Sequence, residues 1–305
     1  MPARETSPKP RRRRPCWAII LAGGSGKRLG KREPKPFVTL ADRPLLSWSI
    51  LAFARHRAVT DVLVVVPRGW SKALKRDVIA PLENELAGLD CTVHPPVVGG
   101  RRRQDSARAG IEAARLLTPA ETIEDTPVLI HDAARPIVLP AMIDELLACV
   151  VHACRAEPGV AGAIPVLPVG DTLKTLRRAP SGTNHPSHGR VLRTVPRAGL
   201  WQVQTPQAFC LGPLLEAHEA AFEAEQAVTD DAMIYEWMGW PVETIPGTPL
   251  NIKVTYPEDL ALLEAWLQAS GGEGLATRPR IRIREEEEPG NGLRARAAAN
   301  IAPKR

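Results

Sequence analysis

A glycine-rich, basic loop follows directly after a short apolar run. The run is CWAIIL at 16–21, the loop reads AGGSGKR at 22–28, and PKP follows at 34–36. Glycines allow backbone N–H groups to wrap around a polyphosphate, and Arg28 and Lys35 add full positive charges. The loop therefore predicts a site for an anionic ligand of the triphosphate type.

The spacing of this loop excludes two common phosphate-binding motifs. A Walker A loop requires a glycine at position 21, where Leu21 stands, and Ser or Thr after Lys27, where Arg28 stands. A dinucleotide fingerprint beginning at Gly24 requires Gly or Ala at the position of Leu29. The glycines alone are also compatible with a mobile surface loop, but their spacing to an arginine and to Pro-Lys-Pro favours a phosphate cradle.

Apolar strands and amphipathic helices alternate along the chain and must position this loop. The expected strands are Trp17–Leu21, Val62–Val66, Val128–Ile130, Ala163–Val166 and Val242–Ile245. The expected helices are Pro44–Arg55, Asp105–Leu117, Ala141–Ala153, Leu214–Glu225, Asp230–Met238 and Pro257–Gln268. This alternation predicts an α/β fold with a mostly parallel sheet covered on both faces, in which ligands bind beyond the carboxyl ends of the strands.

Composition separates a core region from two tails. The chain has 305 residues, 44% of them hydrophobic, and a formal net charge of +6. Residues 1–15 are rich in proline and arginine, and 269–305 has little to bury, so we expect both segments to be disordered. No apolar run approaches the length of a membrane span. The five cysteines are odd in number and scattered, which favours reduced thiols and a cytoplasmic location.

Four further motifs follow the loop in order. They read GGRRRQDS at 99–106, HDAARP at 131–136, WQVQTPQ at 201–207 and NIKVTYPED at 251–259. With the first loop, this ordered set resembles the 2-C-methyl-D-erythritol 4-phosphate cytidylyltransferase family, over residues 16–268. The resemblance implies a Rossmann-like nucleotidyltransferase fold whose protruding β-arm serves in dimerisation.

The resemblance also implies a reaction and a set of site residues. A phosphate oxygen of methylerythritol phosphate would attack the α-phosphorus of CTP, and Mg²⁺ would be held mainly by the CTP phosphates. The catalytic residues implied are Arg28, Lys35, Arg197 and Lys253. The nucleotide-binding residues implied are Ala22, Gly23, Gly24, Gly26, Gly100, Ser106 and Asp132. The substrate-binding residues implied are Asp132, Arg135, Thr172, Arg197, Thr205, Thr229 and Lys253.

Several of these residues also fit ordinary structural roles. Ser106 could cap a helix, Asp132 and Arg135 could pair to order their own loop, and Lys253 could lie on a solvated face. We expect His131 to be structural, because a phosphate nucleophile needs no general base at neutral pH. The chain departs from the family pattern at Arg101, where many members carry a small or acidic residue.

A hairpin-like segment at 168–200 interrupts the alternating pattern. In the family this segment is an arm exchanged between the subunits of a homodimer, and Thr172 and Arg197 match positions that reach the partner's substrate. The arm tip at 179–189 reads as an insertion of disordered composition.

Two other functions remain open from the sequence. A related cytidylyltransferase acting on ribitol phosphate or another polyol phosphate would share the fold and the triphosphate loop. A nucleic-acid-binding protein could use Arg11–Arg14, but no aromatic residues are interleaved with that basic run. We therefore expect CTP and a polyol phosphate as ligands, with neither nucleic acid nor a membrane as a partner.

Overall fold

The computed structural model describes residues 14–24, 29, 34–153, 162–178 and 189–270. Most of both expected tails, most of the arm tip, and the site residues Gly26 and Arg28 lie outside these described residues. The region between the tails holds the remaining predicted site residues.

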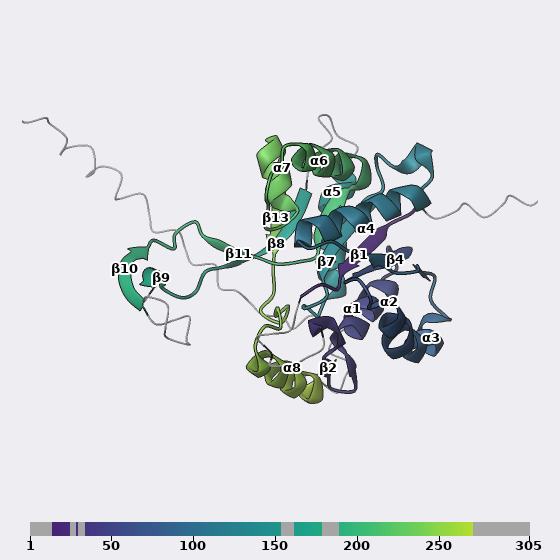
Figure 1. Ribbon diagram of the computed structural model, residues 1–305, viewed down its shortest axis with the longest axis horizontal. Helices are drawn as coiled ribbons and strands as arrows, with labels where there is room; N and C mark the ends of the chain where they lie inside the picture. The colour runs from purple at the N-terminus through teal and green to yellow at the C-terminus, as the bar shows by residue number, and fades with distance from the viewer. Residues whose placement is uncertain (1–13, 25–28, 30–33, 154–161, 179–188, 271–305) are drawn as a thin grey trace, which may run out of the picture.

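A nine-stranded sheet forms the centre of the fold (Figure 1). Its main path runs in the order β11-β8-β12-β7-β1-β4-β5, with β13 paired to β8 and β6 paired to β4. The strands are β1 (Trp17–Leu21), β4 (Asp61–Val66), β5 (Thr92–Val93), β6 (Val97–Val98), β7 (Pro127–Asp132), β8 (Gly162–Pro168), β11 (Trp201–Val203), β12 (Gln207–Cys210) and β13 (Val242–Pro246).

The sheet is mixed, although its core strands are mostly parallel. Strand β1 pairs in parallel with β4 and β7, and β13 pairs in parallel with β8. All five predicted strands are present in this sheet. Sequence patterning did not predict the antiparallel strands β11 and β12 or the strands β5 and β6, because none of them is longer than four residues.

Helices cover both faces of the sheet. The helices are α1 (Leu45–Ala54), α2 (Ser71–Ala73), η3 (a π-helix, Leu74–Ile79), α3 (Ala80–Leu86), α4 (Arg103–Leu117), α5 (Pro140–Ala153), α6 (Leu211–Glu223), α7 (Ala232–Met238) and α8 (Pro257–Ala269). Short elements complete the chain: η2 (Lys35–Phe37), η4 (Ala120–Thr122), β2 (Thr39–Leu40) and β3 (Arg43–Pro44). All six predicted helices are found, with ends shifted by up to three residues. The helical segment from α2 to α3 was not predicted.

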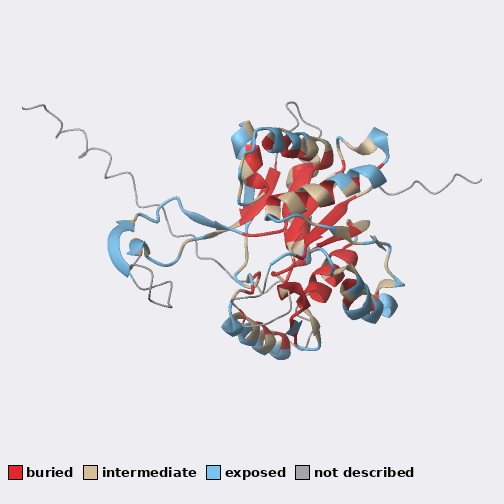
Figure 2. Ribbon diagram, viewed as in Figure 1, coloured by how far each residue is buried: buried red, intermediate tan, exposed pale blue. Residues whose placement is uncertain are grey.

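Two hydrophobic cores lie on opposite faces of the sheet. Along β1, Ala18 and Ile20 pack into the core that α1 and α5 cover, whereas Trp17, Ile19 and Leu21 pack into the core under α4 and α6. Successive side chains of a strand point to opposite faces, so a strand covered on both sides is buried throughout. Figure 2 shows this continuous buried centre.

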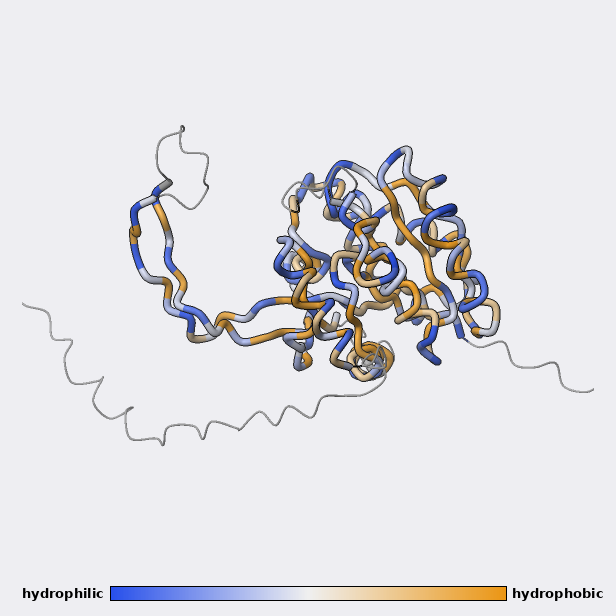
Figure 3. Tube along the Cα trace, turned by 90° about the horizontal axis from the view of Figure 1, so that it is seen from below, coloured by the Kyte–Doolittle hydropathy of each residue, from blue (hydrophilic) through white to orange (hydrophobic). Residues whose placement is uncertain are grey.

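A two-stranded hairpin projects from this body. Strand β9 (Leu173–Arg178) pairs antiparallel with β10 (Gly189–Val195), and the hairpin stands clear of the sheet in two perpendicular views (Figures 1 and 3). Its side chains Leu176, Val191 and Leu192 are exposed. The predicted hairpin at 168–200 is therefore present as a protruding arm.

The structure bears on two simpler expectations. Among the described residues, no helix is long and apolar enough to cross a membrane. Cys16, Cys91 and Cys149 are not in disulfides, as expected. Cys210 is disulfide-bonded, so the expectation of reduced thiols throughout was wrong at this position.

Candidate functional site

A cleft of about 610 Å³ opens at the carboxyl ends of β1, β4 and β7. This is the edge at which parallel α/β sheets bind their ligands. The predicted site residues that line it are Gly23, Gly24, Lys35, Gly100, Ser106, Asp132 and Lys253. Four segments that are far apart in the sequence thus meet at one place.

The first loop enters the cleft with its backbone constrained at both ends. The N–H of Ala22 donates to the carbonyl of Val65 on the neighbouring strand at 2.8 Å. Gly24 has a φ of 110°, a conformation that only glycine adopts readily. The N–H of Lys35 donates to the Gly24 carbonyl at 3.3 Å, and the Lys35 side chain is largely buried. The loop therefore returns to its starting point and places Lys35 in the cleft wall.

The second wall is the tight turn that leads into α4. A Cβ on Gly100 would lie 2.3 Å from the Cβ of Asp105, so this position has room only for glycine. Asp105 accepts a hydrogen bond from the Arg102 N–H at 3.0 Å, and the Ser106 hydroxyl donates to the Arg102 carbonyl at 3.2 Å. Ser106 thus has the local helix contact expected of a structural residue and also lines the cleft. Arg101 is exposed and lines it as well.

Asp132, at the end of β7, is held between two cations. Arg103 donates from Nε to Asp132 Oδ1 at 3.0 Å, and Lys253 donates from Nζ to Asp132 Oδ2 at 2.7 Å. Burial alone would raise the pKa of the Asp132 carboxyl, but the charges and hydrogen bonds of Arg103 and Lys253 outweigh burial and hold it well below its usual range. Asp132 is therefore an ionised carboxylate in the cleft.

Arg103 connects Asp132 to a second, fully buried carboxylate. Its Nη1 donates to Asp231 Oδ2 at 2.7 Å, and Asp231 Oδ1 lies 3.1 Å from His218 Nε2. Burial would raise the pKa of Asp231, but Arg103 and His218 lower it to about 2. Burial would lower the pKa of Arg103, but the two carboxylates raise it above its ordinary value. Both groups are therefore charged.

His131 and Thr205 fix the backbone at Asp132. The Asp132 N–H donates to the Thr205 hydroxyl at 3.0 Å, and that hydroxyl lies 3.1 Å from His131 Nδ1. His131 Nε2 lies 2.9 Å from the carbonyl of Arg135 and must carry the proton there, because a carbonyl only accepts. Burial lowers the pKa of His131 to about 4, so the imidazole is neutral. The Thr205 hydroxyl is buried and engaged by these two protein groups.

Arg135 points towards the segment that carries Lys253. Its Nη1 donates to the Asn251 carbonyl at 2.6 Å and its Nη2 to the Val203 carbonyl at 3.3 Å. Its Nε is buried and has no partner among the described groups. Arg135 therefore joins the end of β11 to the segment that carries Lys253, and it does not line the cleft itself.

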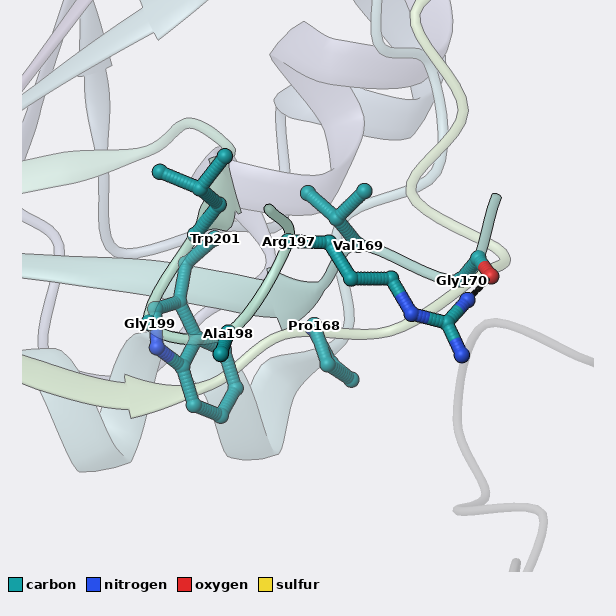
Figure 4. Close-up of a pocket in the computed structure, with 8 residues that line it drawn as sticks. Pro168, Val169, Gly170, Arg197, Ala198, Gly199 and Trp201 are labelled. Atoms are coloured by element: carbon teal, nitrogen blue, oxygen red, sulfur yellow. Dashed lines mark hydrogen bonds between the residues drawn. The ribbon is translucent and has the colours of Figure 1, made fainter. Parts of the chain in front are cut away.

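Like Ala22, Arg135 and Thr205, three further predicted residues lie away from the cleft lining. Thr229 is exposed, with its hydroxyl 3.7 Å from Met233 Sδ. Thr172 and Arg197 are exposed at the base of the arm. Figure 4 shows Arg197 extending to the Gly170 carbonyl, to which it donates a hydrogen bond, in a shallow hollow of about 310 Å³. Within one chain, these side chains do not join the cleft residues.

Sequence patterns did not identify Arg103, Asp231, His218 or Gln207 as parts of this site. Gln207 accepts from the N–H groups of Asp231 and Ala232, both at 3.2 Å, and so holds the start of α7 against β12. Arg103 is the last of three consecutive arginines. Which of the three side chains points inward depends on the residue at which α4 begins, and the sequence pattern did not predict that residue. The available signal in the sequence was the adjacent pair Asp230 and Asp231 at the start of an expected helix. Two adjacent carboxylates at that position could have suggested an ion pair with a basic side chain.

Comparison with known proteins assigns the chain to one family of sequences. The family model described as 2-C-methyl-D-erythritol 4-phosphate cytidylyltransferase matches residues 16–269. A protein of that name from Acidithiobacillus ferrooxidans is 39% identical over 259 residues, covering 85% of this chain and 98% of the relative. A protein of the same name from Syntrophotalea carbinolica is 37% identical over 256 residues, covering 84% and 97%.

Solved structures agree with this comparison. The crystal structure of 2-C-methyl-D-erythritol 4-phosphate cytidylyltransferase from Thermus thermophilus matches with a TM-score of 0.58 and 30% identity. It covers 82% of this chain and 98% of the other. The agreement confirms the predicted fold class, including the Rossmann-like sheet flanked by helices.

Acidification should destabilise the fold through His131. Its pKa is about 4 in the folded chain and about 6.5 when solvated. As the pH falls from 7 to 4, the unfolded chain therefore binds a proton that the folded chain excludes. We expect this residue to lower the free energy of unfolding by about 3 kcal/mol over that range, measured by denaturant unfolding at pH 7 and pH 4.

The variant His131→Gln isolates this contribution. Gln keeps an N–H donor for the Arg135 carbonyl but does not titrate. Its loss of stability between pH 7 and pH 4 should be smaller than that of the unmodified chain by about the same 3 kcal/mol. An equal loss in both proteins would show that His131 does not carry the effect.

Proposed function

The chain belongs to the 2-C-methyl-D-erythritol 4-phosphate cytidylyltransferase family, and from this premise we propose how its residues carry out the reaction. It is a nucleotidyltransferase that joins the cytidylyl group of CTP to 2-C-methyl-D-erythritol 4-phosphate. The observation that carries the site assignment is the convergence of Lys35, Asp132 and Lys253 on one cleft at the carboxyl edge of the sheet.

The reaction requires the site to offset repulsion between two anions. A phosphate oxygen of methylerythritol phosphate forms a new bond to the α-phosphorus of CTP, and the bond from that phosphorus to the bridging oxygen breaks. Pyrophosphate leaves with that oxygen. We assign Lys35 and Arg28 to the α-phosphate, where preorganised cations stabilise the charge of the transition state.

No protein base is needed in this reaction. The attacking phosphate is already deprotonated at neutral pH, so its oxygen can act directly as the nucleophile. His131 is neutral, buried and hydrogen-bonded on both ring nitrogens. These contacts support a role in shaping the loop around Asp132.

We assign the turn at Gly100 and Ser106 to the nucleotide base. A slot lined by backbone and one small hydroxyl has room for a pyrimidine and offers polar partners for its edge. Arg101, beside this slot, adds a positive charge to the cleft wall. We assign Lys253, which lines the cleft, and Arg135, which lies beside it, to the phosphate of the second substrate.

The cleft suits a divalent cation that is bound chiefly by the phosphates of the nucleotide. Among the described residues, no group of three potential protein ligands comes together, and Asp132 is the one carboxylate lining the cleft. This donor set suits Mg²⁺, which keeps several waters and binds chiefly to substrate phosphates. Asp132 would hold the ion or its waters. When bound, the ion neutralises charge on the triphosphate.

A homodimer would complete the site. Thr172 and Arg197 lie at the base of a protruding arm and do not line the cleft of their own chain. The arm exposes Leu176, Val191 and Leu192, which is costly for an isolated chain and ordinary for an interface. We propose that the arm packs on a second copy and brings Arg197 to the partner's substrate.

An assay of pyrophosphate release tests the assigned reaction. The chain, supplied with CTP and Mg²⁺, should release pyrophosphate with methylerythritol phosphate and far more slowly with ribitol phosphate. In the same assay, Lys35→Ala should lower turnover by ~10²–10³-fold, because one preorganised transition-state donor is lost. The exposed Lys72 of α2 provides the matched control, and Lys72→Ala should stay within about twofold of the unmodified rate.

Two outcomes would count against these assignments. Faster release with ribitol phosphate would reassign the substrate. Normal turnover by a folded Lys35→Ala protein would remove Lys35 from the reaction.

Mixed dimers test the proposed exchange of the arm. The Arg197→Ala and Lys35→Ala chains should each be nearly inactive alone. In a hybrid dimer, one site regains both groups, because the Arg197→Ala chain keeps its own Lys35 and receives Arg197 from its partner. Random exchange makes about half of the dimers hybrid, so about a quarter of the normal activity should return. Subunits that exchange without recovering activity would show that Arg197 does not act across a dimer.

A further inference from the structure

Arg103 is the first residue of α4 and reaches two carboxylates on different elements. Its Nε contacts Asp132 at 3.0 Å, at the end of β7, and its Nη1 contacts Asp231 at 2.7 Å, just before α7. Only 23% of its side chain is exposed, and Nη2 is buried with no partner among the described residues. Such a position is costly for a charge unless its contacts are retained.

The charges alternate in sign from the cleft to the protein interior. Lys253 contacts Asp132, Asp132 contacts Arg103, and Arg103 contacts Asp231. Lys253 is about half exposed at the cleft end, whereas Asp231 is 1% exposed at the inner end. Two cations and two carboxylates balance, so the row of four charges has no net charge. The inner carboxylate is the fixed end of this row of charges.

Contacts on both its backbone and its carboxylate hold Asp231 in place. Its N–H donates to Gln207 at 3.2 Å, and its Oδ1 lies beside the buried His218 ring. Arg103 is anchored to that carboxylate by a short, charge-assisted hydrogen bond. A planar guanidinium with two engaged nitrogens has a defined orientation, which a lysine ammonium would lack.

This anchoring determines how the Asp132 carboxylate is turned. Arg103 occupies Oδ1, and the Thr205 hydroxyl fixes the backbone N–H, so Oδ2 is the oxygen left to hold Lys253. Lys253 itself is a flexible side chain with its ammonium at the cleft. Its Nζ is therefore located by Asp132, and Asp132 is oriented by Arg103.

We propose that Arg103 is a positioning residue for the cytidylyl transfer, acting through Asp132 to place the ammonium of Lys253. This role rests on the proposed function of Lys253 in the cleft. Arg103 does not act by adding its own charge to the reacting phosphates. It is held by Asp231, it orients Asp132, and Asp132 in turn positions the half-exposed ammonium of Lys253.

A purely structural role predicts a different pattern of kinetics. If Arg103 only ties α4 to α7, its loss lowers stability and affects the reaction independently of Lys253. If it acts through Lys253, its loss lowers kcat and has little further effect once Lys253 is absent. A double-mutant cycle separates the two roles, because only coupled residues deviate from additivity.

The experiment measures kcat and KM for CTP in full-length Arg103→Gln, Arg103→Lys, Lys253→Ala and the two double variants. Arg103→Gln should lower kcat by ~10²-fold, the cost of misplacing a reacting group by about 1 Å, with KM within about threefold. Arg103→Lys keeps a charge beside Asp231 and should fold, yet one ammonium does not hold two carboxylates in fixed orientation. We expect it to lower kcat at least about tenfold.

The double variants give the deciding result. In the Lys253→Ala background, either change at Arg103 should lower kcat by less than about threefold. Arg108, on the same helix and paired with Glu112 away from the cleft, provides the control. Arg108→Gln should keep kcat within about twofold in both backgrounds. Thermal melting of every variant establishes that it is folded, and Arg103→Lys decides the question if Arg103→Gln does not fold.

Three outcomes would overturn the proposal. Additive losses in the double variants would show that Arg103 acts independently of Lys253. A normal kcat in folded Arg103→Lys and Arg103→Gln would show that the orientation it sets is unimportant. Full activity of Lys253→Ala would remove the residue through which Arg103 is said to act. Absence of pyrophosphate release from the unmodified chain would instead overturn the proposed function, and the role of Arg103 with it.

Discussion

The ionised carboxylate of Asp132, held between Arg103 and Lys253, is the contact on which the cleft depends. A carboxylate this buried would ordinarily favour its protonated form, and only the two adjacent cations keep it charged. Each cation comes from a different part of the chain: Arg103 begins α4, and Lys253 precedes α8. The position of Asp132 at the end of β7 is therefore useful only because both segments converge there.

The architecture explains why they converge. Strands β7, β1 and β4 are parallel neighbours, so their carboxyl ends and the loops that follow them share one edge. Antiparallel β12 lies beside β7. Thr205, just before β12, accepts a hydrogen bond from the Asp132 N–H, and Gln207 accepts one from the Ala232 N–H at the start of α7. Neutral groups thus fix the backbone, and charged groups fix the side chains that face the cleft.

Sequence reasoning predicted the parts of this arrangement that depend on local pattern. The alternation of β-branched strands and amphipathic helices gave β1, β4 and β7 with ends correct within two residues, and the glycine loop pointed to the ligand edge. The inward turn of Arg103, the burial of Asp231 and the engaged hydroxyl of Thr205 depend on tertiary contacts between distant segments. Strand β12 was missed because its burial comes from both neighbours rather than from its own composition.

Titration of Asp132 tests this account most directly. In the full-length protein, the side-chain carboxyl signal of Asp132 can be followed by carbon-13 NMR from pH 7 to pH 4. The account predicts that it keeps its ionised chemical shift at pH 4, because Arg103 and Lys253 hold its pKa below the usual range. A signal that has moved about halfway to the protonated shift at pH 4, as for a solvated aspartate, would contradict it.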